Sequence, residues 1–251
     1  MQPPSSPRLV STAAALLIGN ELLSGKTREA NLCELARTLR TLGVRLARVV
    51  MVGDEVEVIA REVTALSEGF DVVFTSGGIG PTHDDVTIDA VAQAFGVATC
   101  ADPGMEALLR AHYQDRCSDA HLRMALVPDG AELATADDVP WPTVLMRNVW
   151  VLPGIPEVFR MKLSVVRAWI RGPAPFLTRA VLTRLEEPDL KPLLDQIVAA
   201  HPSVEVGSYP KWLGADYRTK ITFDSLEARS LQAALDAFLS QVPTTAVVRT
   251  E

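Results

Sequence analysis

Short apolar runs alternate with amphipathic segments along the first hundred residues of the chain. The apolar runs are rich in aliphatic and β-branched residues, as strands buried on both faces usually are. They cover residues 12–18, 44–52 and 71–75. The amphipathic segments repeat apolar residues three and four positions apart, which predicts helices over residues 27–42, 55–68 and 82–95. This order predicts an α/β fold with a mostly parallel sheet and helices on both faces.

The middle of the chain is less regular. Residues 103–116 and 119–126 have a helical pattern, and residues 144–152 predict a hairpin that turns at Arg147-Asn148. A further helix is expected to end near residue 171. The sequence Pro140-Trp141-Pro142 argues against regular structure at that point, because proline lacks the N–H group that a ladder requires.

A different pattern follows Gly172-Pro173-Ala174-Pro175, which is typical of a linker. The strands predicted after it cover residues 177–185, 204–209, 217–223 and 245–249. The helices predicted between them cover residues 188–200 and 226–241. This βαββαβ order is that of a small ferredoxin-like α+β domain. We therefore expect two domains, an α/β domain over residues 8–171 and a ferredoxin-like domain over residues 176–251.

The charge and cysteine content narrow the classes of function. The chain has 251 residues, a formal net charge of −7 and a pI near 5.2, so the dense basic surface of a nonspecific nucleic-acid-binding protein is not expected. No apolar stretch reaches the roughly 20 residues of a membrane span. Three cysteines without a CxxC pattern predict neither a disulfide framework nor a zinc site. A reducing, cytoplasmic location is expected.

The apolar run near the N-terminus has an alternative interpretation. Because Arg8 precedes it, the run could be a short secretory signal. However, it leads directly into Gly19-Asn20-Glu21 without a convincing cleavage site, which favours a first buried strand.

The sequence Ser76-Gly77-Gly78-Ile79-Gly80-Pro81 carries the clearest candidate chemistry. It follows a buried strand and precedes a predicted helix, so backbone N–H groups at the helix start would face the loop and favour an anion. Glycines allow close backbone approach to a ligand at the carboxyl end of such a strand. The spacing is neither that of a Rossmann fingerprint nor that of a P-loop. Alternatively, the glycines form only a tight turn.

Acidic residues lie in and near this loop. Asp84 and Asp85 follow it directly, and Thr82 and Asp85 have the spacing of a capping box, which is a purely structural alternative. Asp54 ends the second strand, where it would either cap the next helix or add a second carboxylate to the same edge of the sheet. Two carboxylates near a phosphate suit a Mg²⁺-assisted phosphoryl reaction.

The loops together resemble those of the molybdopterin-binding-domain superfamily. Within it, the chain is similar to the competence-damage-inducible protein A (CinA) family and to the N-terminal domain of eukaryotic FAD synthase. The resemblance rests on three motifs: Ile18-Gly-Asn-Glu-Leu-Leu-Ser-Gly25 with Asn31, Gly53-Asp54-Glu55, and Gly77-Gly-Ile-Gly-Pro-Thr-His-Asp-Asp-Val-Thr87. Weaker support comes from Val127-Pro128, Val151-Leu-Pro-Gly-Ile-Pro156 and Gly207-Ser-Tyr-Pro210.

The resemblance implies a three-layer α/β/α sandwich and a metal-dependent nucleotide pyrophosphatase that hydrolyses ADP-ribose or FAD. Asp54 and Asp85 match the positions of two functional aspartates in related adenylyltransferases. It also implies a divalent metal (Mg²⁺, Mn²⁺ or Co²⁺) together with K⁺. Some relatives have Asp where this chain has Asn20, which removes one metal carboxylate. Because the chain ends after the ferredoxin-like segment, the amidase activity of longer relatives and FAD synthesis are not expected.

We therefore predict a site for a nucleotide or pterin phosphate, with Asp54 and Asp85 as catalytic residues. The predicted metal ligands are Asp54, Asp84 and Asp85. The predicted phosphate-binding residues are Gly19, Asn20, Glu21, Ser24, Gly25, Asn31, Ser76, Gly77, Gly78, Gly80, Pro81 and Thr82. Two alternatives stay open, a molybdopterin-binding or adenylylating protein of cofactor biosynthesis and a non-catalytic nucleotide-binding protein. A homo-oligomer is expected, a dimer more readily than a trimer.

Overall fold

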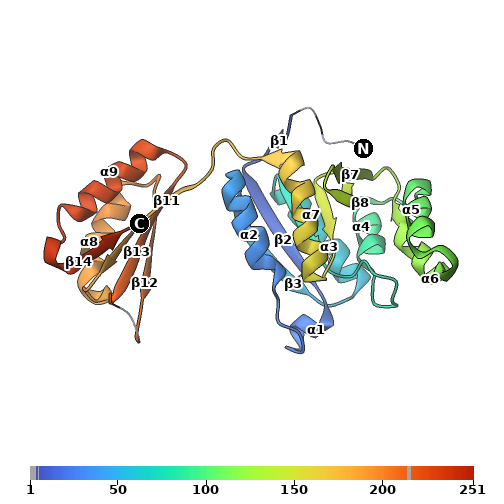
Figure 1. Cartoon of the computed structure of the whole chain (residues 1–251), viewed down its shortest axis with the longest axis horizontal. Coiled ribbons are helices and arrows are strands. Elements are labelled where there is room, and N and C mark those ends of the chain that lie inside the picture. The colour runs from blue at the N-terminus through green and yellow to red at the C-terminus, as the bar shows by residue number, and fades with distance from the viewer. Residues whose placement is uncertain (1–3, 5, 214–215) are drawn as a thin grey trace. The chain divides into compact units, whose positions relative to one another are not determined.

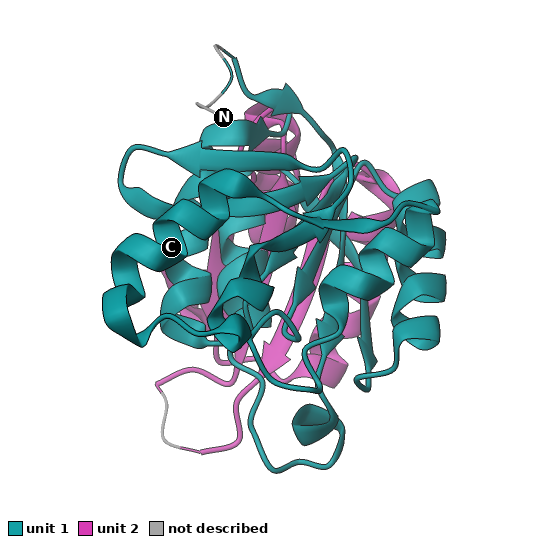
Figure 2. Cartoon of the chain, turned by 90° about the vertical axis from the view of Figure 1, so that its right-hand side faces the viewer, with its two compact units in different colours: residues 1–173 teal, residues 174–251 magenta. Residues whose placement is uncertain are grey.

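The protein consists of two compact units, residues 1–173 and residues 174–251 (Figure 2). The structure, a computed structural model, describes residue 4 and residues 6–213 and 216–251.

A six-stranded sheet forms the centre of the first unit, with the strand order β3-β2-β4-β9-β8-β7 (Figure 1). Its strands are β2 (Thr12–Ile18), β3 (Arg45–Val52), β4 (Val72–Ser76), β7 (Glu132–Ala136), β8 (Val139–Met146) and β9 (Val149–Leu152). Neighbours among β3, β2, β4 and β9 pair in parallel, whereas β8 pairs antiparallel with both β9 and β7. The prediction of a mostly parallel sheet is confirmed.

Helices cover both faces of this sheet, as Figure 1 shows. One face packs against α2 (Asn31–Leu42) and α7 (Pro156–Trp169), and the other packs against α3 (Val56–Gly69) and α4 (Thr87–Phe95). Strand β2 contributes to both cores because successive side chains point to opposite faces. Ala13 and Ala15 lie in the first core, Ala14 and Leu16 lie in the second, and all four are 0% exposed. The apolar run at the N-terminus is therefore a central strand.

The less regular middle of the chain packs beside α4 as short elements. They are β5 (Thr99–Ala101), α5 (Pro103–Tyr113), η1 (Gln114–Arg116), α6 (Asp119–Leu122), η2 (Arg123–Ala125) and β6 (Leu126–Pro128). Two short strands, β1 (Arg8–Leu9) and β10 (Ile170–Arg171), pair in parallel. The predicted hairpin is confirmed: β8 and β9 meet at Arg147, whose φ is 54°, and Asn148.

The proline-rich sequence lies inside β8, contrary to the prediction. Pro140 and Pro142 fall in an irregular stretch of the β7–β8 pairing, so their missing N–H groups interrupt no regular ladder. The carbonyl oxygens of Trp141 and Pro142 each accept a hydrogen bond from Nζ of Lys162, at 2.6 Å. This buried lysine on α7 thus fastens the backbone of the proline-rich stretch to the helix that packs on the sheet.

The second unit is a four-stranded antiparallel sheet with two helices and its own core. Its elements are β11 (Leu177–Thr183), α8 (Glu187–Ala200), β12 (Glu205–Pro210), β13 (Thr219–Ser225), α9 (Ala228–Leu239), η3 (Thr244–Ala246) and β14 (Val247–Thr250). The strand order β12-β13-β11-β14 is that of the ferredoxin-like fold, which confirms the predicted fold class.

The expectation that the three cysteines are small buried thiols is wrong. All three cysteines are free; Cys33 and Cys100 are exposed, and Cys117 is half-buried. Within residues 4, 6–213 and 216–251, no helix combines the length and the apolar character needed to cross a bilayer.

Candidate functional site

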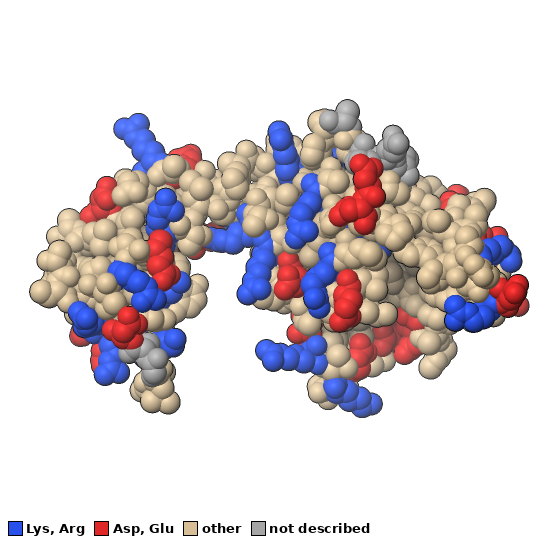
Figure 3. All heavy atoms as spheres, viewed as in Figure 1, with Lys and Arg blue, Asp and Glu red and all other residues tan. Residues whose placement is uncertain are grey.

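The carboxyl ends of four parallel strands meet at one edge of the first unit's sheet. Strands β2, β3 and β4 each continue directly into a glycine, namely Gly19, Gly53 and Gly77, and β9 continues into Pro153-Gly154. Ligands bind at such an edge in open α/β sheets. In Figure 3 acidic side chains gather at the lower border of this unit, where α1 (Asn20–Leu23) lies in Figure 1.

The glycine loop after β4 has a backbone that only glycine adopts readily. The φ angles of Gly77 and Gly78 are 109° and 66°. A Cβ atom on Gly77 would collide with the carbonyl oxygen of Ile18, and one on Gly78 would collide with Oγ1 of Thr87. Gly154 also approaches closely, since its Cβ would lie 3.3 Å from Cα of Gly77. The loop therefore requires glycine for both conformation and space.

Thr87 holds this loop from the side of α4. Its buried hydroxyl donates to the carbonyl oxygen of Gly77 at 2.8 Å, and its N–H donates to that of Gly78 at 2.9 Å. The N–H of Gly77 donates to Leu152 at 3.2 Å. Sequence reasoning did not single out Thr87, although it is the last residue of the acidic motif.

Three consecutive N–H groups of the loop remain available. Those of Gly78, Ile79 and Gly80 have no hydrogen-bond acceptor among the residues that the structure describes. All three residues are half-exposed. Successive N–H groups in a glycine-rich turn form a concave site for an anion. This feature is the strongest geometric support for the predicted phosphate site.

The helix after the loop begins five residues later than predicted, at Thr87 rather than Thr82. Residues 82–85 form a turn instead. The carboxylate of Asp85 accepts hydrogen bonds from the N–H of Thr82, at 2.8 Å, and from its hydroxyl. This is one half of a capping box without a helix after it. The free N–H groups that face the site therefore belong to the loop and not to a helix terminus.

Asp84 and Asp85 share one partner. The Thr82 hydroxyl also lies 2.6 Å from Oδ1 of Asp84, and this hydrogen bond lowers the pKa of the Asp84 carboxyl below its ordinary value. Asp85 lies against the loop, since a Cβ on Gly80 would be 2.6 Å from its Oδ2. The turn thus places a carboxylate next to the free N–H groups.

Asn31 and Ser76 were predicted to bind phosphate, but their polar groups are used inside the protein. Nδ2 of Asn31 donates to Oγ of Ser76 at 3.0 Å and to the carbonyl oxygen of Gly154 at 2.8 Å. Both side chains are buried. They connect α2 with the ends of β4 and β9, which assigns them a positioning role. That role stays a prediction until it is tested.

The loop after β2 joins the loop after β3. The carboxylate of Asp54 accepts the N–H of Asn20 at 2.8 Å, so it does not cap α3 as the alternative interpretation proposed. Thr27 does not begin α2 either; the carboxylate of Glu29 accepts the N–H groups of Asn31 and Leu32 at the true helix start. Of the remaining predicted residues of this loop, Gly19 directly precedes α1, Glu21 lies on α1, and Ser24 and Gly25 lie in the turn after it.

The carboxylates at this edge do not form a complete metal cage. Among the described residues, no three His, Cys, Asp or Glu side chains lie close enough together to hold an ion. A hard divalent cation that binds substrate phosphates usually takes only one or two carboxylates from the protein and keeps several waters. Asp85, with Asp84 beside it, fits that more open kind of site, and so does Asp54.

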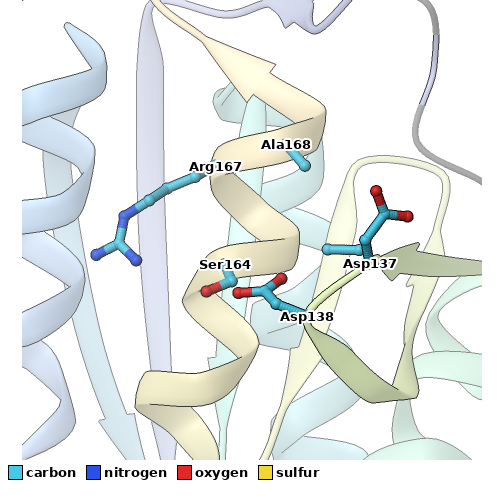
Figure 4. A pocket seen from close by; sticks show the side chains of 6 residues that line it. Asp137, Asp138, Ser164, Arg167 and Ala168 are labelled. Atoms are coloured by element: carbon cyan, nitrogen blue, oxygen red, sulfur yellow. The ribbon is translucent and has the colours of Figure 1, made fainter.

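A separate hollow of about 520 Å³ lies between the β7–β8 turn and α7 (Figure 4). Asp138 and Ser164 point toward each other there, whereas Arg167 points away toward α2 and donates to Thr38 Oγ1 at 2.9 Å. The hollow includes none of the predicted site residues.

Comparison with known families divides the chain where the structure does. The description "probable molybdopterin binding domain" matches residues 14–171, and the description "FAD synthase, middle domain" matches residues 175–251.

Individual relatives match either most of the chain or only a part of it. A probable FAD synthase of Caenorhabditis briggsae is 29% identical over 88% of this chain and 48% of its own length. The chain therefore spans about half of that relative. A CinA-like protein of Desulfosudis oleivorans is 32% identical over 61% of the chain and 38% of its own length. The crystal structure of CinA from Thermoplasma acidophilum is 26% identical, with a TM-score of 0.58, and covers 63% of this chain and 96% of its own.

Proposed function

The chain belongs to the family of the probable molybdopterin binding domain, and from this premise we propose that it binds a nucleotide and hydrolyses a dinucleotide at its pyrophosphate bond. The observation that carries the proposal is the row of free N–H groups at Gly78, Ile79 and Gly80, with the Asp85 carboxylate beside it. The similarity to probable FAD synthases extends over both units and favours a flavin or ADP-ribose dinucleotide.

The loop would bind the phosphates through its backbone. Consecutive N–H groups without an internal acceptor can stabilise negative charge on phosphate oxygens, and they need no reorganisation as the charge shifts toward the leaving oxygen. Lys26 and Arg28 lie on the exposed part of the loop between α1 and α2, where they would neutralise further charge. The alternative interpretation is that both are ordinary solvated side chains without a role in binding.

The carboxylates would act on the attacking water. Oδ2 of Asp85 is held by Thr82, which leaves Oδ1 to accept a proton. The water oxygen forms a bond to one phosphorus while the bond from that phosphorus to the bridging oxygen breaks. The proton passes to Asp85, and two phosphate monoesters are released. Asp54, held through Oδ2 by Asn20, would orient the water or the substrate.

A divalent cation, with K⁺ as a second cation, would supply charge neutralisation at the phosphates. Asp84 and Asp54 are the residues that would hold it, which leaves Asp85 to act on the water. The Asp84 carboxylate, whose pKa the Thr82 hydroxyl lowers below its ordinary value, is ionised at neutral pH, as a ligand for a hard cation must be.

The test measures hydrolysis of FAD, ADP-ribose and NADH with Mg²⁺, Mn²⁺ or Co²⁺, with product chromatography as the readout. Asp85→Asn should lower kcat by about 100-fold or more, the usual contribution of a positioned general base. Asp89→Asn is the matched control, because this exposed residue lies four positions away on α4. It should leave the rate unchanged.

Two results would contradict the proposal. Tight dinucleotide binding without any product would make the protein a nucleotide-binding protein without catalysis. Transfer of AMP from ATP to molybdopterin, with no dinucleotide hydrolysis, would favour the adenylylating activity of cofactor biosynthesis instead.

A further inference from the structure

Strand β3 forms an open edge of the first unit's sheet. It pairs with β2 on one side, and its backbone donates no hydrogen bond on the outer side to any other described residue. With eight residues it is long for an edge strand. Proteins usually blunt or cover such edges, because the unpaired N–H and C=O groups are a template for another strand.

Apolar side chains accompany this edge. Val49 is 42% exposed and Met51 is 38% exposed on β3, and Leu23 of α1 is 56% exposed. Leu23 lies beside the end of the strand, since a Cβ on Gly53 would be 3.8 Å from its Cδ1. We name Leu23, Val49 and Met51 the β3 strip. An exposed apolar row next to an unpaired backbone is typical of a surface that another molecule covers.

The charges along the edge are opposite at its two ends. Arg45 and Arg48 are exposed in the first half of β3, whereas Glu55 and Glu57 are exposed just after it. When two copies of an edge strand pair about a two-fold axis, they run antiparallel, so the beginning of one strand meets the end of the other. The basic end of each copy would then face the acidic end of its partner.

We propose that β3 pairs with β3 of a second copy of this chain, antiparallel about a two-fold axis, so that two six-stranded sheets become one. The self-complementary charges favour a second copy over another protein. The second half of the strand would carry most of the pairing, because Ala47 is an extra residue that disturbs the register in the first half. The loop at Gly53–Glu55 adjoins this edge, so the pairing brings basic side chains of the second copy to an acidic border of the candidate site.

Sedimentation of the full chain over a wide concentration range tests the proposal. The wild-type protein should sediment as a dimer. Met51→Lys should shift it toward the monomer and raise the dissociation constant by about tenfold or more, since it puts an unpaired charge into the contact. Val198→Lys is the matched control. Val198 is 48% exposed on α8 in the second unit, so this variant should sediment like the wild type.

Exchanging the charges of Arg48 and Glu55 distinguishes a loss of strand pairing from misfolding of the chain. Arg48→Glu and Glu55→Arg should each weaken the dimer, and the double variant should restore much of the loss, because opposite charges again face each other.

Several outcomes would overturn the proposal. A wild-type protein that sediments as a monomer would overturn it. A dimer that Met51→Lys leaves intact, or a dimer that dissociates only in the Val198→Lys variant, would also overturn it. Protection of Met51 from oxidation in a monomeric protein would also overturn it, because the edge would then be covered without a second copy.

Discussion

The side-chain amide of Asn31 donates both of its hydrogens within the protein, to Ser76 and to the carbonyl oxygen of Gly154. The residue is only 5% exposed, so no water replaces a lost donor easily. It begins α2 and also links the ends of β4 and β9. In the proposed phosphate site, Asn31 would hold Gly154 against Gly77 and so keep the glycine loop in place.

Asn31→Ala should lower the free energy of unfolding by about 1–3 kcal/mol, the cost of leaving buried polar groups without partners. It should also weaken dinucleotide binding, because the loop loses its support. Urea unfolding and calorimetry measure the two effects. Asn20→Ala is the control for stability, since that side chain is exposed. If the two variants unfold at the same urea concentration, Asn31 does not hold the loops.

Lys162 is a second buried polar residue, 6% exposed and without a carboxylate partner among the described residues. Burial lowers its pKa from 10.5 to about 8. Between these two pH values the unfolded chain binds a proton that the folded protein does not bind. Stability should therefore rise with pH across this window, and below about pH 8 the folded protein carries the cost of a buried charge.

The gain from pH 8 to pH 10.5 should be at most roughly 3–4 kcal/mol, since each unit of pKa shift corresponds to about 1.4 kcal/mol. The measurement compares the denaturant midpoints of the wild type and of Lys162→Met at several pH values. The difference between the two proteins isolates the contribution of Lys162 from that of other titrating groups. Parallel pH profiles for the two proteins would show that Lys162 keeps its ordinary pKa.

At the scale of the element, the pattern of apolar residues predicted β2, β3, β4 and the β8–β9 hairpin, because a strand buried on both faces leaves a run that few other structures require. It did not predict β7 or the beginning of β8, which lie at the antiparallel end of the sheet. Helix starts were predicted less well. The spacing of Thr82 and Asp85 is that of a capping box, and their hydrogen bonds do form. The helix still begins at Thr87, because Thr87 bonds back to Gly77 and Gly78. Such a long-range contact leaves no local signal.

The same limit applies to the candidate site. Parallel strands bring their carboxyl ends together, so the sequence predicted which loops would meet. It did not predict which polar groups those loops would use among themselves. The carboxylate of Asp54 bonds to Asn20, thirty-four residues earlier in the chain. Pairing of that kind depends on how the finished loops pack.

One prediction at this scale concerns the glycine loop after β4. Gly77→Ala should destabilise the protein and abolish high-affinity phosphate binding, because its Cβ would meet the Ile18 carbonyl and because φ of 109° is unfavourable for alanine. Gly69→Ala is the matched control. That glycine ends α3, has open space around it and should stabilise slightly, by up to about 1 kcal/mol.

Thermal unfolding and phosphate titration compare these two variants. Equal effects of Gly77→Ala and Gly69→Ala on binding would mean that the loop is a plain turn, as the alternative interpretation of its glycines proposed.

At the scale of the whole molecule, the two units have separate hydrophobic cores. The largest side chains make this clear: Phe159 on α7 is 1% exposed in a core of the first unit, and Phe238 on α9 is 0% exposed in the core of the second. A unit with its own core and its own sheet can unfold without the other. The chain should therefore show two calorimetric transitions.

The two phenylalanines allow that expectation to be tested with matched variants. Phe159→Ala and Phe238→Ala each remove a buried ring, at a cost of about 3–5 kcal/mol. Phe159→Ala should lower the transition temperature of the first unit alone, and Phe238→Ala that of the second alone. Differential scanning calorimetry of the full chain distinguishes these shifts. A single transition that both variants lower would mean that the units fold as one cooperative body, so a site in the first unit would then depend on the stability of the second.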